Sequence, residues 1–455
     1  MKFIKEQWAF LVVILLVTVA IGFRLKVYGN LRLSMTNNDT PGYISSSEVN
    51  LLSWGAFTGR RLFTTNAVYQ VLRPQSGYQI LVNGSINTTI RRIQKSFVDI
   101  VFLQITLSVL GWGLLALAFT SQIKNAILKI LAALLILGFA FVPQIVDWDS
   151  LLTSESLTFS LFAFQFTLLI ILAFRLSKIP SLNWMTGLLL LTWLITVFFW
   201  TFLRDTNLYG LLIDLVSILS LFIFQQFRKQ LYILGGAVVL IGILILGWVS
   251  SGQSQRSLIA LNEVYQVVVL PNPAVSSFMH SLGMPDPNSP QYATWFAKNA
   301  KSAYLKFLIA HPGYITTIYY RDTLKAFADG MQPYFNTPEA PIRISLIPTG
   351  MAFHPDNPSP VFLDLILLAG LWILALKKRL PQAGPWVWLA TWVFLFASLN
   401  MFVVIFGDSY GLTRHALLAT TVFRLFTWVF IIVVIDLALL PNQRTENMQP
   451  VMVEG

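Results

Sequence analysis

Long apolar stretches recur along this chain, and they constrain its fold more than any motif does. Each is close to the roughly 20 residues that cross a lipid bilayer as a helix. We place ten of them at residues 8–23, 98–119, 126–146, 152–174, 184–203, 208–227, 231–250, 361–376, 386–406 and 416–440. Because 56% of the 455 residues are hydrophobic and 11% are charged, one water-soluble core could not bury them. We therefore predict an all-α fold, a polytopic bundle of about ten transmembrane helices.

Basic residues in the short loops predict how the bundle is oriented. The first apolar stretch follows Lys2 and Lys5 and lacks a small-residue cleavage site, so we interpret it as a retained anchor with a cytoplasmic N-terminus. Threading ten spans from that start gives a cytoplasmic side that is rich in Lys and Arg, as membrane topology favours. Its basic positions are Lys124, Arg175, Lys178, Arg228, Lys229, Lys377, Lys378 and Arg379. Both termini are then cytoplasmic.

The net charge of +11 follows from this topology and from attraction to anionic lipids. It does not indicate a nucleic-acid partner, which would require a basic face on a soluble domain. The chain contains no cysteine, which excludes disulfides and a cysteine nucleophile. We expect membrane lipids to surround most of the protein.

The spans divide the chain into three parts, residues 1–250, 251–360 and 361–455. Two long segments, 24–97 and 251–360, lie on the outer side and carry enough apolar residues to be ordered. In the first, the sequence from Asp39 to Tyr43 is typical of a helix start, and we predict a surface helix ending near Gly59. In the second, we predict helices over 291–310 and from His311 to a stop at Gly330. We expect these helices to pack over the outer mouth of the bundle.

Acidic residues of the outer loops are the first candidates for a site. Asp39 either caps its helix or projects into a cleft. Asp147 and Asp149 are two residues apart in what we take to be an extended turn, so both could face one divalent cation such as Mg²⁺ or Mn²⁺, or both could cap the next helix. Glu155 is expected about one turn inside that helix, where an ionised carboxylate requires a partner, a metal or a wet cavity.

Cations with nearby acids occupy two further outer turns. Arg204 and Asp205 fill one turn, and Asp408 precedes Arg414 and His415 in the other. Local salt bridges and snorkelling explain either turn without a ligand. Arg424 lies about 13 Å along the last span at 1.5 Å per residue, where a cation is costly. Asp214 or an anionic ligand could neutralise it.

Short motifs in this layout resemble those of a known family. They are Asn38-Asp39-Thr40-Pro41-Gly42-Tyr43 in the first outer loop, Asp147-Trp148-Asp149 in the second, and Ser154-Glu155 at the next span. The chain resembles bacterial glycosyltransferases of the C superfamily, multi-span enzymes related to the family 39 and mannosyltransferase-like enzymes that use polyprenyl-phosphate-linked sugars. It departs from them in having Asn-Asp where many relatives have two acids.

This resemblance implies an enzyme of the bacterial cytoplasmic membrane that transfers a sugar, with inversion, from a polyprenyl-phosphate donor to a glycan, lipid or protein acceptor on the outer face of that membrane. It implies that Asp39 is the catalytic base. Transfer requires cations to stabilise the leaving phosphate, and the candidates are Arg204, Arg414, His415 and Arg424. The acids expected to support them or bind sugar are Asp147, Asp149, Glu155, Asp205 and Asp408. A transporter or lipid flippase, and a polysaccharide polymerase or ligase, remain alternative functions.

Overall fold

A computed structural model describes residues 2–81, 92–179, 181–328, 341–378, 380, 382–407 and 411–441. Helices make up most of this part of the chain, together with a sheet of two short strands. The all-α prediction is therefore confirmed. Eight helices are long and apolar enough to cross a membrane: α1 (Lys2–Val27), α5 (Val98–Gln122), α8 (Glu155–Lys178), α9 (Trp184–Thr201), α11 (Leu231–Gln253), α17 (Ser359–Lys378), α18 (Ala383–Gly407) and α20 (Leu417–Leu439).

Two of the ten predicted spans are shorter than expected. The stretch 126–146 contains α6 (Ala126–Ala140), after which the chain bends by 52° into Pro143–Ser150, with α7 (Pro143–Val146) at its start. Pro143 has no backbone N–H with which to continue α6. The stretch 208–227 contains α10 (Asn207–Ser220), which gives way to 3₁₀ turns. The prediction of an integral multi-pass protein is confirmed, whereas these two helix lengths were overestimated.

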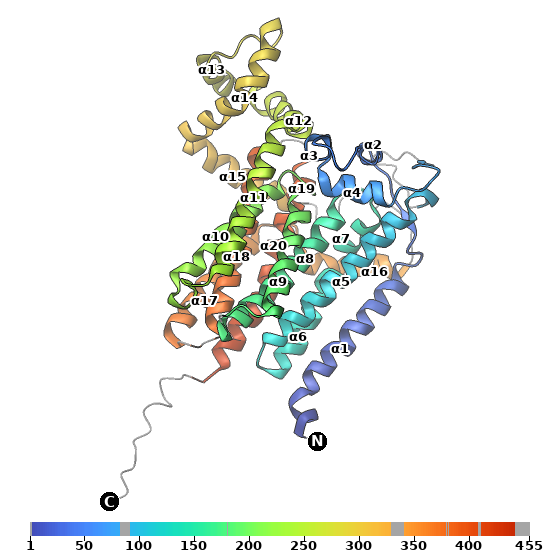
Figure 1. Cartoon of the computed structure of the whole chain (residues 1–455), viewed down its shortest axis with the longest axis vertical. Coiled ribbons are helices and arrows are strands. Elements are labelled where there is room, and N and C mark those ends of the chain that lie inside the picture. Colours follow the sequence, from blue (N-terminus) through green and yellow to red (C-terminus); the bar gives the residue numbers. More distant parts are fainter. Residues whose placement is uncertain are drawn as a thin grey trace, which may run out of the picture.

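The two ends of the bundle differ in what they carry. In Figure 1, α1 begins and α20 ends at the lower end, and the helices within residues 40–71 and 255–310 gather at the upper end. In the first segment, the predicted surface helix is divided into α2 (Thr40–Ser46) and α3 (Gly55–Thr58), and α4 (Phe63–Val71) follows. The strands β1 (Leu33–Ser34) and β2 (Arg92–Ile93) pair antiparallel.

The second long segment forms a helical cap and a return helix. It contains α12 (Gln255–Val264), a π-helical turn (Tyr265–Val269), α13 (Pro273–Ser281), α14 (Pro290–Ala310), α15 (Pro312–Phe327) and α16 (Pro341–Phe353). The predicted helices over 291–310 and after His311 are confirmed as α14 and α15, while Gly330 lies outside the described residues. The return helix α16 packs on α7 at Gly350, where an added Cβ atom would displace the amide end of the Gln144 side chain.

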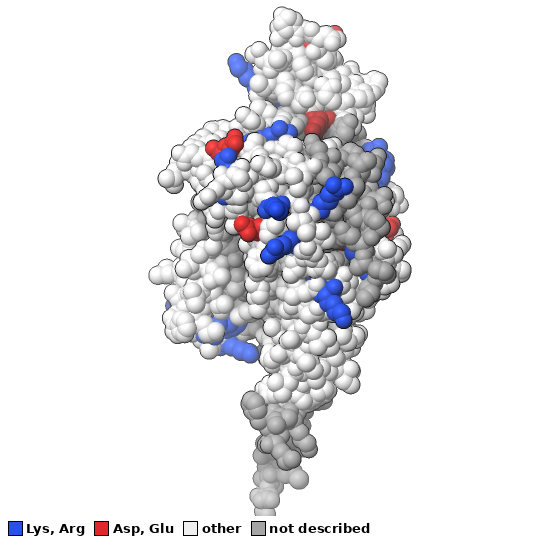
Figure 2. Space-filling view, turned by 90° about the vertical axis from the view of Figure 1, so that its right-hand side faces the viewer, with Lys and Arg blue, Asp and Glu red and all other residues white. Residues whose placement is uncertain are grey.

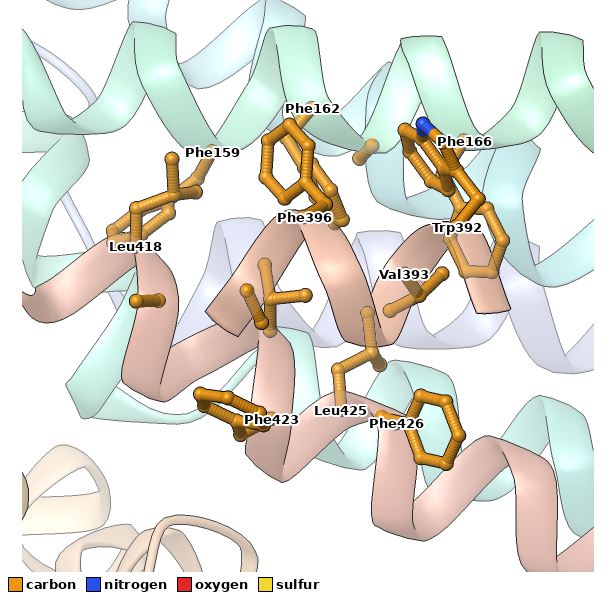
Figure 3. Close-up of a cluster of buried hydrophobic side chains, with 14 of the residues drawn as sticks. Phe159, Phe162, Phe166, Trp392, Val393, Phe396, Leu418, Phe423, Leu425 and Phe426 are labelled. Carbon is orange, nitrogen blue, oxygen red and sulfur yellow. The ribbon is translucent and has the colours of Figure 1, made fainter. Parts of the chain in front are cut away.

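Aromatic side chains fill the centre of the bundle between α8, α18 and α20. Figure 3 shows the cluster, in which Phe162 from α8 stacks on Trp392 from α18 with ring centroids 6.0 Å apart. Phe426 from α20 lies on the other side of α18. This packing holds together helices that begin or end at the upper end of the bundle in Figure 1, so it helps to position the segments gathered there.

Candidate functional site

A carboxylate held between two arginines lies at the upper end of the bundle. Asp39 directly precedes α2, but its side chain makes no capping hydrogen bond. Its Oδ2 accepts a hydrogen bond from Arg414 Nη1 at 2.6 Å, and its Oδ1 accepts one from Arg61 Nη2 at 3.2 Å. Of the two roles considered for Asp39, the structure therefore favours projection toward the bundle over helix capping.

Arg414 joins Asp39 to a second acid. It lies on α19 (Leu412–His415), which begins after Gly411, a residue in the left-handed region with φ of 69° that glycine adopts at little cost. Its Nε donates to Glu155 Oε1 at 2.6 Å. One guanidinium therefore bridges the residue before α2, the start of α8 and the entry to α20, which are far apart in the sequence.

Arg204 completes a set of five charged residues that we call the arginine–carboxylate network. Its members are Asp39, Arg61, Glu155, Arg204 and Arg414. Arg204 Nη1 lies 3.7 Å from Glu155 Oε1. The Arg61 guanidinium carbon lies 4.0 Å from the ring centroid of Tyr43, close enough for a cation–π interaction. The Tyr43 hydroxyl donates a hydrogen bond to the Ser154 hydroxyl and accepts one from the Ser154 backbone N–H, both at 3.2 Å. Ser154 directly precedes Glu155.

Burial in the network decreases toward Asp39. The side chain of Glu155 is 1% exposed, that of Arg414 is 13% exposed and that of Asp39 is 34% exposed. Burial alone would favour the neutral form of Asp39, but the charges of Arg414 and Arg61 lower its pKa well below the usual range. Burial likewise disfavours the Arg414 cation, but Glu155 and Asp39 raise its pKa well above the usual value. At neutral pH the network is a set of charges that solvent reaches at one edge.

Asp147 and Asp149 form a different arrangement, in a segment that we call the acidic turn (residues 147–150). This segment is a 3₁₀ helix rather than the extended turn predicted from the sequence, and it is buried. Asp147 pairs with Arg343 from α16, and Asp149 pairs with Arg24 from the end of α1. The two carboxylates therefore pair with different arginines instead of facing one shared cation. The N-cap residue of α8 is Ser154, so neither acid occupies the capping position of that helix.

Asp149 also receives a hydrogen bond of 2.7 Å from Ser156 on α8, and its partner Arg24 donates to Ser108 on α5 at 3.1 Å. The acidic turn thus ties α1, α5, α8 and α16 together. The residues that the structure describes include no cluster of three or more Asp, Glu or His that could hold a metal. A divalent cation at Asp147 and Asp149 stays a prediction, and it would have to compete with both arginines.

Arg424 does not pair with Asp214, the partner considered from the sequence. Its guanidinium donates to the carbonyl of Pro355 at 2.8 and 3.1 Å and to that of Phe327 at 3.1 Å. Asp214 accepts hydrogen bonds from Gln165 and from Trp392. Its Nη2 also lies 4.0 Å from Asp356 Oδ1, so the acid nearest to Arg424 is Asp356 and not Asp214. Arg424 therefore secures the chain segments on either side of α16 through backbone carbonyls and this acid.

The remaining candidates lie near the network or outside the described residues. His415 follows Arg414 on α19, and its ring lies close to Gly411. The Asp205 carboxylate accepts a hydrogen bond from the backbone N–H of Thr206 at 3.0 Å, so it stabilises its own turn. Asp408 lies outside the described residues.

Three arginines with central positions were missed from the sequence: Arg24, Arg61 and Arg343. All three belong to segments assigned to the outer side or its boundary, where basic residues are less favoured than on the cytoplasmic side. The same segments contain many other basic residues, so their sequence did not single these three out. Their partners come from distant parts of the chain, which no local pattern could show.

No protein-family model matches this chain, and no curated protein matches it.

Proposed function

We propose that this protein is a membrane glycosyltransferase that moves a sugar from a polyprenyl-phosphate donor to a glycan, lipid or protein hydroxyl at the upper end of the bundle in Figure 1. The observation that carries the proposal is the position of Asp39. It is a partly exposed carboxylate among cations, at the edge of an apolar bundle where a lipid-linked donor would present its phosphate. The proposal takes this end to be the outer face, as the loop charges predict.

The charges of the network suit a phosphate ligand. Among the described residues, three arginines contact two carboxylates, Asp39 and Glu155. Arginine binds phosphate through two parallel N–H groups, and such hydrogen bonds are stronger than neutral ones. A donor phosphate at this edge would therefore compete with Asp39 for Arg414 and Arg61.

This competition would supply the base for the reaction. With both arginines on Asp39, the low pKa makes its carboxylate ionised but weakly basic. When a phosphate binds Arg414, the attraction that lowers the pKa of Asp39 weakens, and the carboxylate becomes a stronger base. Only a carboxylate beside the phosphate site would be activated in this way.

The transfer step then balances without a covalent intermediate. The acceptor hydroxyl oxygen forms a bond to the anomeric carbon while the bond from that carbon to the donor phosphate oxygen breaks. The hydroxyl proton passes to Asp39, and the new phosphate charge is stabilised by Arg414 and Arg204. Direct displacement inverts the anomeric carbon. Glu155 holds both arginines in place.

Replacement of Asp39 with Asn tests the proposal. Asn keeps the shape but not the basicity, so we expect transfer to fall by at least about a thousandfold. The assay compares surface glycans and lipid-linked sugars of a deletion strain that expresses wild type, Asp39→Asn or Glu48→Gln at equal membrane levels. Glu48 is an exposed acid of the same outer segment and serves as the matched control. Unchanged products with Asp39→Asn would refute the proposal.

Buried carboxyl groups deeper in the bundle favour one alternative, a transporter or lipid flippase. Asp214 lies between Gln165 and Trp392, and Asp364 accepts a hydrogen bond from Thr427 at 2.6 Å. Acids at this depth are costly and often line permeation pathways. If Asp214→Asn stops lipid or solute movement in proteoliposomes while Asp39→Asn does not, the transporter is correct.

A further inference from the structure

An apolar cavity lies at the opposite end of the bundle from the arginine–carboxylate network. It has a volume of about 320 Å³ and opens to the surface of the bundle between α8, α9, α11 and α18. Its walls are mostly hydrocarbon, with Leu172, Leu190 and Trp388 among the lining residues, and the polar groups of Ser177, Thr186 and Gln226 lie in the same lining.

The cavity has a structural cause. The helix α10 ends at Ser220 after only 14 residues, and the chain continues as two 3₁₀ turns, Leu221–Ile223 and Gln225–Phe227. Residues of these turns line the cavity in place of the missing part of a helix. Protein interiors contain few voids larger than a water molecule, so an open apolar space of this size favours a hydrocarbon occupant.

Basic side chains lie close along the chain to the cavity lining. Lys178 follows Ser177, and Arg228 and Lys229 follow Phe227; all three are exposed. The segments that contribute the lining at this end, 174–190, 221–236 and 382–388, contain no Asp or Glu. On the face shown in Figure 2, Lys and Arg are visible nearer to the lower end of the molecule than any visible Asp or Glu.

We propose that this cavity binds an anionic phospholipid, with one acyl chain between α8, α9, α11 and α18 and its phosphate near Lys178 and Lys229. The apolar walls select a hydrocarbon chain, and the basic residues beside the lining select an anionic headgroup. The site is separate from the network that contains Asp39, so it does not depend on the proposed transfer activity.

Lipid titration of the purified full chain tests this site. Native mass spectrometry compares retention of phosphatidylglycerol and phosphatidylcholine with identical acyl chains. Because each basic residue near an anionic surface contributes to attraction, we expect phosphatidylglycerol to bind at least about tenfold more tightly, and Lys178→Gln with Lys229→Gln to remove most of that difference. Lys377→Gln removes a basic residue elsewhere at this end and is the control.

A second pair of variants tests the cavity itself. Gly384 lines the cavity, and a Cβ atom added there would meet no other atom within 4 Å, so Gly384→Phe should fill the space and lower phosphatidylglycerol retention about tenfold. Gly235 is equally open but does not line the cavity, so Gly235→Phe should retain the lipid. Equal retention of both lipids by wild type, or undiminished retention by Gly384→Phe, would overturn the proposal.

Discussion

The acidic turn and the arginine–carboxylate network use the same side chains in different ways. In the acidic turn, Asp147 and Asp149 are buried and pair with Arg343 and Arg24. In the network, three arginines share two carboxylates, and Asp39 is about one third exposed. A buried pair with its charges matched holds helices together, whereas a cation-rich set at a solvent-accessible edge can accept an anion.

This difference moves the site away from the strongest sequence signal. The sequence Asp147-Trp148-Asp149 carries two acids in three residues, yet its position suits bracing of the bundle. Asp39 is a single acid in its loop, and its importance comes from Arg414, which is 375 residues away along the chain. Burial and the ratio of positive to negative side chains therefore indicate the position of the site better than the number of acids in a motif does.

The largest stability effect should come from breaking a pair in the acidic turn. Arg343→Ala leaves the Asp147 carboxylate buried without its arginine, so we expect a loss of about 3–5 kcal/mol in the free energy of unfolding. Denaturant unfolding in detergent measures it. Arg73→Ala, which breaks an exposed pair with Glu48, should change stability by less than about 1 kcal/mol. Similar losses in the two variants would contradict a bracing role for the acidic turn.

Replacing Arg61 or Arg204 of the network should have a smaller effect, which acts on transfer activity and not on stability. Arg61→Gln or Arg204→Gln removes one partly exposed cation, so we expect transfer to fall about tenfold, equivalent to about 1.4 kcal/mol. Arg60→Gln is the matched control, because Arg60 is exposed beside Arg61 and is not part of the network. The measurement is product formation at equal protein levels. If Arg60→Gln lowered transfer as much as Arg61→Gln, general surface charge would explain the effect.

The smallest expected effect is on the pH dependence of stability. Arg414 and Arg61 lower the pKa of Asp39 in the folded protein, so its ion pairs stabilise the fold above the ordinary carboxyl pKa of about 4. This contribution is lost as the pH falls below that value toward the lower folded pKa. Wild type and Asp39→Asn should therefore differ in stability by a constant amount from pH 5 to 8 and converge only in stronger acid. Convergence near pH 6 would show that the pKa is not lowered.

Much of the fold could be predicted because hydrophobicity is a local property. The eight long spans and the helices α14 and α15 follow from apolar stretches and from proline at helix starts. The lengths of α6 and α10 could not be predicted in this way, because an apolar stretch does not reveal where a helix bends. Pro143 was the local sign that the first of them ends early.

The site was predictable only in part. Asp39, Glu155, Arg204 and Arg414 were all candidates from the sequence, and the structure brings these four together. Their pairing, and the contribution of Arg61, depend on loops that meet in three dimensions. Arg424 does have the partners that a buried cation requires, but they are two backbone carbonyls and Asp356 instead of Asp214.

The most direct test compares Arg414→Gln with Arg343→Gln for binding of a short-chain isoprenyl phosphate to the purified protein. If the network binds lipid phosphate and the acidic turn only braces the fold, folded Arg414→Gln protein should bind at least about tenfold more weakly than wild type. Arg343→Gln protein that remains folded should bind as wild type does. Wild-type affinity in folded Arg414→Gln protein would contradict the central claim that this network receives the donor phosphate.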